Sequence, residues 1–208
     1  MKRVMMLMVL AVSMLSIVGC NSVGGGKISR NPALNAAPLG LELGYADYAG
    51  FQSWLGEKLK KEKLKLDELK KQEAYKEDTS PEGEKMIFVS QKGLVDGMEI
   101  GKFLFDKSGI LVYAVINRGG DINEIYKTMK SKYKLTSAEP KSGFTFTDIF
   151  ASSGTYVEFE FGDTKMNLSQ SMVNGIEIAY ATNSFLKTVD EDQAAKSKKQ
   201  KARDASNL

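Results

Sequence analysis

Two runs of short strand-like segments, each preceded by a helical pattern, constrain this fold more than any other feature of the sequence. The first run comprises residues 85–90, 98–106 and 110–117, and the second comprises residues 143–151, 155–161 and 176–182. Turn-forming residues separate the strands, as Ser108 and Gly109 do within the first run. Strands that follow one another through short turns pair antiparallel, so we predict an α+β fold with an antiparallel sheet and its helices packed on one face.

A helix is predicted ahead of the first run of strands, over residues 47–60. Asp47 is a suitable N-cap, and the apolar residues after it recur at spacings of three and four: Tyr48, Phe51, Leu55 and Leu59. The next stretch is rich in Lys and Glu, which favours continuation of the helix to residue 77. Residues 63–66 also alternate as a strand would, so this continuation has an alternative.

A second helix is predicted between the two runs, over residues 121–134. Asp121 and Glu124 have the spacing of a capping box, and one apolar stripe follows them, made by Ile122, Ile125, Tyr126, Met129 and Tyr133. The order of elements is therefore a helix and three strands, repeated once. It allows two tandem α-β-β-β units within one domain of residues 39–189.

The chain contains no histidine and one cysteine, Cys20. This composition excludes His-based triads, His-ligated metals and Cys-rich zinc sites, and we expect no metal, no cofactor and no catalytic residue. Glu158 and Glu160 share one face of a predicted strand, as an acid–base pair of carboxylates would. The opposite face of that strand is predicted to enter the core through Val157, Phe159 and Phe161. The two glutamates then lie in solvent, which is typical of a surface rather than of a catalytic site.

The first residues of the chain have the pattern of an export signal. Lys2 and Arg3 precede an uncharged run over residues 4–18, which as a helix is about 22 Å long. A permanent transmembrane helix must cross about 30 Å of hydrocarbon, so a secretory signal is favoured.

The segment Ile17-Val18-Gly19-Cys20 resembles the lipobox of bacterial lipoproteins. The resemblance implies that residues 1–19 are a signal peptide cut between Gly19 and Cys20, and that Cys20 carries a diacylglycerol and an acylated amino group. Asn21, where Asp would favour the inner membrane, implies the outer membrane, facing the periplasm. The alternatives are an ordinary secreted protein with one chance cysteine and a short buried helix.

The composition changes at both ends of the mature chain. Glycines and prolines predict a flexible linker over residues 20–38, and charged residues predict a disordered or frayed helical tail over residues 190–208. The tail could also contact anionic lipid headgroups or cell-wall polymer. Removal of Lys2 and Arg3 with the signal lowers the net charge from +3 to +1, so the pI of 8.7 does not indicate a nucleic-acid partner.

The predicted domain resembles the helix-plus-meander modules of envelope proteins, such as the small lipoprotein of the β-barrel assembly machinery and the β-lactamase inhibitor protein. The resemblance rests on Gly40-Leu41-Glu42-Leu43-Gly44 before the first helix, on the strand and turn at residues 103–109, and on the order of elements. It carries over no functional residue.

These features predict a non-enzymatic, lipid-anchored envelope protein that binds another envelope protein, as an assembly or accessory factor. The alternative is an inhibitor or immunity protein that plugs a secreted enzyme or toxin. Its plug would be the turn at Gly119-Gly120 or the loop at residues 162–174.

Cys20→Ser is expected to abolish acylation and signal cleavage, because the serine hydroxyl cannot form the thioether. The variant should keep residues 1–19 and lose incorporation of labelled palmitate, as measured by intact mass and by cell fractionation. Unchanged processing and fractionation in this variant would contradict the assignment of Cys20.

Overall fold

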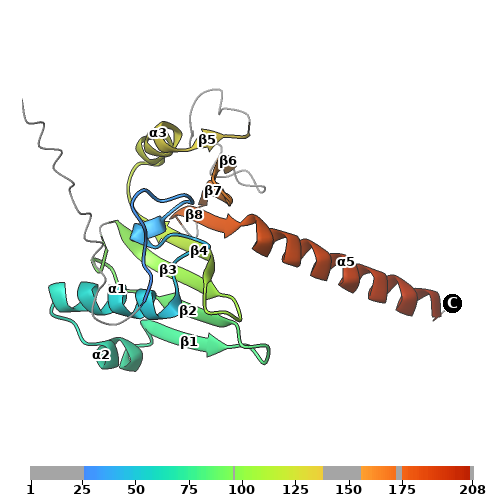
Figure 1. The fold of residues 1–208 in the computed structure, drawn as a ribbon, viewed down its shortest axis with the longest axis horizontal. Helices are drawn as coiled ribbons and strands as arrows, with labels where there is room; N and C mark the ends of the chain where they lie inside the picture. The colour runs from blue at the N-terminus through green and yellow to red at the C-terminus, as the bar shows by residue number, and fades with distance from the viewer. Residues whose placement is uncertain (1–25, 96, 138–155, 172–174, 207–208) are drawn as a thin grey trace, which may run out of the picture.

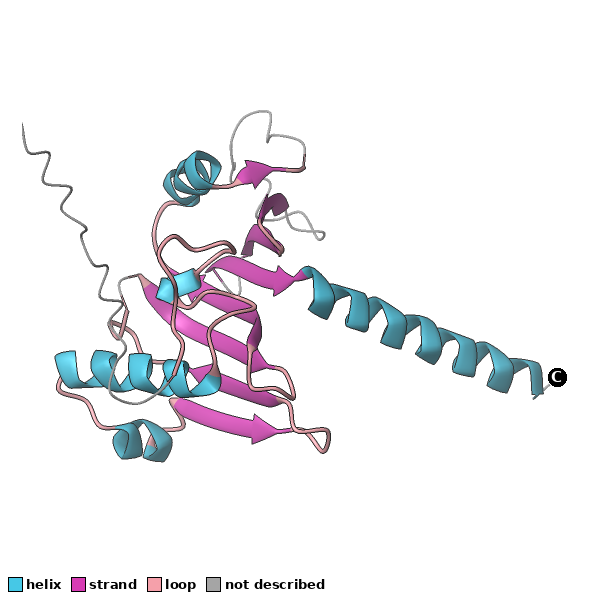
Figure 2. Cartoon of the chain, viewed as in Figure 1, coloured by secondary structure: helices cyan, strands magenta, loops and turns pink. Residues whose placement is uncertain are grey.

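The computed structural model describes residues 26–95, 97–137, 156–171 and 175–206, which form one eight-stranded sheet with helices (Figures 1 and 2). The strands lie in the order β1-β2-β3-β4-β8-β7-β6-β5. Every neighbouring pair of strands is antiparallel. The predicted α+β class with an antiparallel sheet is therefore confirmed.

The chain forms two successive halves. The first contains η1 (Pro38–Gly40), α1 (Tyr48–Lys61), α2 (Leu66–Lys71), β1 (Tyr75–Thr79), β2 (Lys85–Val89), β3 (Met98–Phe105) and β4 (Leu111–Arg118). The second contains α3 (Ile122–Lys132), β5 (Lys134–Leu135), β6 (Tyr156–Phe161), β7 (Thr164–Ser171), β8 (Gly175–Thr182) and α5 (Asn183–Ser206). Among the described residues, each half has one or two α-helices followed by a meander of four strands, whereas three strands were predicted for each half. The strand predicted at residues 143–151 lies outside the described residues.

The region after α1 differs from its prediction. The helix ends at Lys61, and Lys63 has a φ of 55°, in the left-handed region that an α-helix cannot continue through. After the short α2, the polar segment from Tyr75 to Thr79 is strand β1, paired with β2. Continuation of the helix to residue 77 is therefore wrong. Backbone pairing at the edge of the sheet outweighs the helix propensity of Lys and Glu.

The two halves are joined through their last strands. β4 pairs with β8 from Tyr113↔Ala181 to Arg118↔Ile176, at the middle of the sheet. Opposite residues of an antiparallel pair point to the same face, so the register assigns each residue of β4 and β8 to one side. Ile116 and Ile178 thus share one face, and Val115 and Ala179 share the other.

Ring contacts identify the face that the helices cover. Phe51 of α1 packs on Phe103 of β3 at 4.9 Å between ring centroids, and Tyr126 of α3 packs on Phe159 of β6 at 6.0 Å. Leu69 of α2 belongs to the same buried core. The helices α1, α2 and α3 therefore cover one face of the sheet, as predicted, and we call the other face the open face.

A buried carboxylate holds the segment ahead of α1. Glu42 has no solvent exposure, and its Oε1 accepts hydrogen bonds from the backbone N–H groups of Leu34 and Asn35 at 2.9 and 3.0 Å. The Arg30 guanidinium lies 3.2 Å from the same oxygen. Burial raises the pKa of Glu42, but these hydrogen bonds outweigh burial and the pKa is lowered.

Residues 26–38 are consequently part of the folded domain. Lys27 exchanges hydrogen bonds with the N-cap Asp47, through its N–H to Oδ1 at 2.8 Å and through its carbonyl to the Asp47 N–H at 3.0 Å. The chain passes so close to α1 that a Cβ on Gly50 would lie 1.9 Å from the Lys27 oxygen. The domain therefore already includes Gly26, and the linker predicted for residues 20–38 is shorter.

Helix α5 begins at Asn183 and projects away from the sheet (Figure 1). Phe185 in its first turns packs on Tyr113 of the open face, at 5.2 Å between ring centroids. The helix continues through Val189, the predicted end of the domain, so the described part of the charged tail is helical. At 24 residues it is about 36 Å long.

Glu42→Gln should lower the free energy of unfolding by about 2–3 kcal/mol, because the N–H donors and Arg30 lose a charged acceptor. The lowered pKa of Glu42 means that its carboxylate contributes stability above pH 4.5 that is lost as the pH falls. Urea unfolding at pH 7 and pH 3.5 measures both effects, and the variant should lose less stability on acidification. The exposed, ion-paired Glu124→Gln is the control and should change stability by less than about 0.5 kcal/mol. Equal effects of the two variants would contradict this role.

Candidate functional site

The open face of the sheet is the largest surface that α1, α2 and α3 leave uncovered. Its residues follow from the strand register and include Lys76, Asp78, Met86, Phe88, Ile100, Lys102, Leu104, Tyr113, Val115, Asn117, Lys134, Tyr156, Glu158, Glu160, Lys165, Asn167, Ser169, Glu177, Ala179 and Ala181. Among the described helices, only the first turns of α5 contact this face, at Tyr113.

The first half of the open face has a group of apolar side chains with charged residues beside it. The Met86 side chain on β2 is 53% exposed, and its cross-strand neighbour on β3 is the half-buried Leu104. Phe88 lies two residues along β2 and is also half-buried. The sequence Lys-Met-Ile-Phe-Val of β2 places apolar residues on both faces, since Ile87 and Val89 point into the core. This absence of alternation is the sequence signal for a second apolar face, and the sequence reading did not use it.

The second half of the open face is polar and hollow. A concavity of about 510 Å³ lies where β6, β7 and β8 meet the start of α5, and Tyr113, Glu158, Glu160 and Lys165 line it. Glu160 forms an ion pair with Lys134. Glu158 is exposed, as predicted for this face, and Val157 and Phe159 on the opposite face are buried. Phe161 at the strand end is 37% exposed and does not enter the core as predicted.

The two segments predicted as inhibitory plugs do not both form loops. Residues 164–171 of the predicted loop 162–174 form strand β7, which pairs with β6 and β8, so that prediction is wrong. Its alternating Met166 and Leu168 enter the core and supply the burial that holds the strand. The Gly119-Gly120 turn lies at the mouth of a cleft on the helix side.

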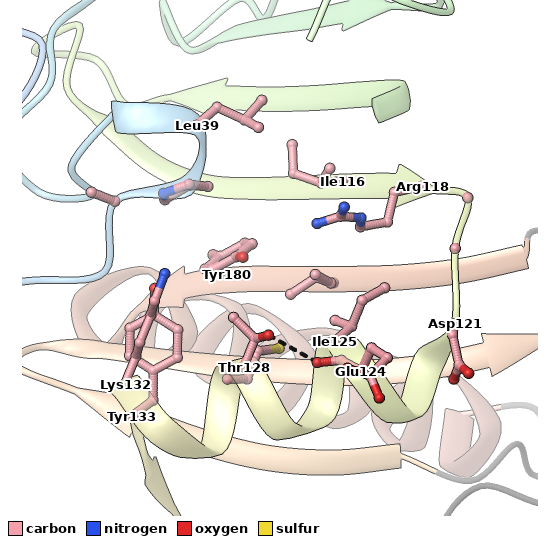
Figure 3. Close-up of a pocket in the computed structure, with 16 residues that line it drawn as sticks. Leu39, Ile116, Arg118, Asp121, Glu124, Ile125, Thr128, Lys132, Tyr133 and Tyr180 are labelled. Atoms are coloured by element: carbon pink, nitrogen blue, oxygen red, sulfur yellow. Dashed lines mark hydrogen bonds between the residues drawn. The ribbon is translucent and has the colours of Figure 1, made fainter. Parts of the chain in front are cut away.

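This cleft, the helix-side cleft, lies over the joint between the two halves (Figure 3). It has a volume of about 480 Å³, within the usual range for ligand sites. Ile116, Ile178 and Tyr180 of the central strands line it from below. The wall opposite η1 is formed by one side of α3, with Ile125, Met129 and Lys132.

Arg118 lies at the end of the cleft, and Figure 3 shows its side chain turned into it. Its Nε is buried and has no hydrogen-bond partner. The guanidinium packs against Gly97, where a Cβ would lie 2.6 Å from Nη2. The sequence reading placed residues 110–117 in a strand but did not identify Arg118, because only the register shows on which face a strand-end residue points.

A polar cluster between α1 and the edge strand β1 connects these two elements. The hydroxyls of Tyr48 and Tyr75 donate hydrogen bonds to the two carboxylate oxygens of Glu77, both at 2.8 Å. Lys85 forms an ion pair with the same carboxylate at 3.4 Å. Burial, together with the hydrogen bond to Glu77, raises the pKa of Tyr48 to about 12. Both tyrosines are thus protonated donors at neutral pH, and the cluster holds an edge strand to a helix.

The lipobox residues Gly19 and Cys20 lie outside the residues that the structure describes. Within residues 26–95, 97–137, 156–171 and 175–206, no helix is long and apolar enough to cross a bilayer, and no acidic or Cys cluster could hold a metal ion.

No protein-family model, curated protein or solved structure matches this chain. Its function must therefore be inferred from the chemistry of the two sites and from the sequence.

Tyr48→Phe should lower the free energy of unfolding at pH 7 by about 1 kcal/mol, because one hydrogen bond to Glu77 is lost. A raised folded-state pKa means that the Tyr48 hydroxyl contributes stability below pH 10 that is lost as the pH rises to about 12. The variant should therefore lose less stability than the parent between pH 10 and 12, as measured by urea unfolding. Tyr156→Phe, at a side chain that is 55% exposed, is the control. A parental pH profile in Tyr48→Phe would exclude this contribution.

Proposed function

We propose that this protein is a non-enzymatic lipoprotein of a bacterial cell envelope that binds a partner protein through its open face. The observation that carries the proposal is the apolar area around Met86, Phe88 and Leu104, which no described helix covers. Exposed apolar patches rimmed by polar residues mark interaction sites on folded proteins. The rim here is charged, with Lys102 beside Phe88 and Glu177 near Asn117.

The composition of the open face is typical of an interface. Aromatic residues and Met are enriched in interface centres, and charges surround them. Tyr113 lies in the middle of the sheet, between the apolar half and the polar hollow. A partner that covers Tyr113 would therefore contact both halves of the sheet and the base of α5, where Phe185 packs.

The path of the amino-terminal segment supports an orientation in which the open face is turned away from the membrane anchor. Gly26 lies against Ala49 and Gly50 of α1, so the amino-terminal segment enters the domain in the helix layer. The open face is on the other side of the sheet. With Cys20 acylated, the helix layer lies nearer the attachment point and the open face is left for a partner. The location that we propose is the periplasmic side of the outer membrane, which Asn21 supports through the resemblance to bacterial lipoproteins.

A photo-crosslinking amino acid at Met86 should capture one defined envelope protein in intact cells, whereas the same group at Glu57 should not. Both positions are exposed, and Glu57 lies on α1 in the opposite layer. Met86→Asp should then reduce the affinity for the captured protein at least roughly tenfold, because a charge is buried at the interface centre. Glu57→Lys is the matched control and should leave the affinity unchanged. Equal capture from both positions would contradict an interface on the open face.

A further inference from the structure

The helix-side cleft has a different chemistry from the open face and needs its own explanation. Arginine side chains carry a positive charge throughout the physiological pH range. Burying a charge without an acceptor is costly. The structure nevertheless holds the buried Nε of Arg118 without a hydrogen bond, at the end of a cleft.

The acidic residues that line the cleft are engaged elsewhere. Asp121 caps α3, where its Oδ1 accepts a hydrogen bond from the Asn123 N–H at 2.7 Å. Glu124 forms an ion pair with Lys127 at 2.9 Å. Neither carboxylate forms an ion pair with Arg118 among the described residues. Arg118 therefore has no ion-pair partner among the residues that line the cleft, although Asp121 and Glu124 balance the charges of Arg118 and Lys132 in the lining as a whole.

Tyr180 adds a hydrogen-bond donor to the cleft. Burial raises the pKa of Tyr180 by more than the Arg118 charge lowers it, so its hydroxyl is protonated at neutral pH. Lys132 lines the other end of the cleft, beside Tyr133 (Figure 3). Gly97 leaves room for the guanidinium beside the strand end, which fixes its position before a ligand binds.

The cleft also has apolar side chains, beside the polar Asp121, Glu124 and Thr128 of its lining. Leu39 of η1 lies across the cleft from Ile125 of α3, with Ile116 of β4 between them (Figure 3). These apolar residues form one part of the lining. This part suits a flexible hydrocarbon body, whose burial is favoured in proportion to its area.

We propose that the helix-side cleft binds an amphipathic anion, with its carboxylate or phosphate head on Arg118 and its hydrocarbon chain between η1 and α3. The head would accept two parallel hydrogen bonds from the guanidinium, the geometry that arginine offers to carboxylates and phosphates. The chain would lie over Ile116 and Ile178, at the joint between the two halves. This site lies on the opposite face of the sheet from the open face, so it does not depend on partner binding there.

The test is a calorimetric titration of the full-length Cys20→Ser chain, which lacks acyl chains that could compete, with four probes. Octanoate and octyl phosphate supply both the anionic head and the chain, and they distinguish a carboxylate from a phosphate source. Octylammonium reverses the charge, and acetate lacks the chain. We expect binding of at least one of the first two probes, and binding of the last two that is at least roughly tenfold weaker.

Arg118→Met in the same chain removes the charge and keeps the length of the side chain. It should weaken binding of the preferred probe at least roughly tenfold. Without ligand it should also raise the midpoint of thermal unfolding, because a half-buried cation whose buried Nε has no acceptor is replaced by an apolar group. Lys60→Met, at an exposed position of α1 outside the cleft, is the control and should bind as the parent does. Non-specific association with the apolar residues 4–18 would be the same in all three chains.

Three results would overturn the proposal. The first is parental binding of octanoate and octyl phosphate by Arg118→Met, since the anion would then lie elsewhere. The second is equal binding of octylammonium or acetate, since the cleft would then select neither charge nor chain. A lowered unfolding midpoint for Arg118→Met would show that the guanidinium is already compensated in the folded protein, which would also overturn it.

Discussion

The antiparallel pairing of β4 with β8 is the interaction on which the rest of the structure depends. It converts two four-stranded meanders into one sheet, from Tyr113↔Ala181 to Arg118↔Ile176. Without it, each meander would expose an edge strand made largely of apolar residues, a known route to aggregation. The same register sends Ile116 and Ile178 toward the helices and Val115 and Ala179 toward the open face, so it defines both sites at once.

Much of the fold follows from local sequence patterns, where one physical cause dominates. Helix α3 was predictable because Asp121 caps it and its apolar stripe is regular. Strand β1 was not, since its polar residues gain from pairing with β2 that no local pattern reveals. The tie of the amino-terminal segment to Glu42 was equally hidden, because glutamate is buried only where donors from distant residues converge on it.

The candidate sites were less accessible to sequence reasoning than the fold. The apolar residues of β2 could have indicated a second apolar face, but which face the helices cover depends on packing, as Phe51 on Phe103 shows. Arg118 owes its environment to strand register, to Gly97 and to η1, which come from separate parts of the chain. The two faces of the sheet nevertheless differ physically: one packs against α1, α2 and α3 and carries the helix-side cleft, and the other carries the exposed Met86 beside Phe88 and Leu104.

The docking of Gly26 beside Gly50 limits how far an anchored domain could stand from a bilayer. Only residues 20–26 would connect an acylated Cys20 to the folded part. A fully extended chain covers at most about 3.6 Å per residue, so the six steps from Cys20 to Gly26 reach about 22 Å. Such a short tether would keep the domain close to the membrane. A partner would have to lie at the membrane surface, and the domain could not reach proteins on the far side of the periplasm.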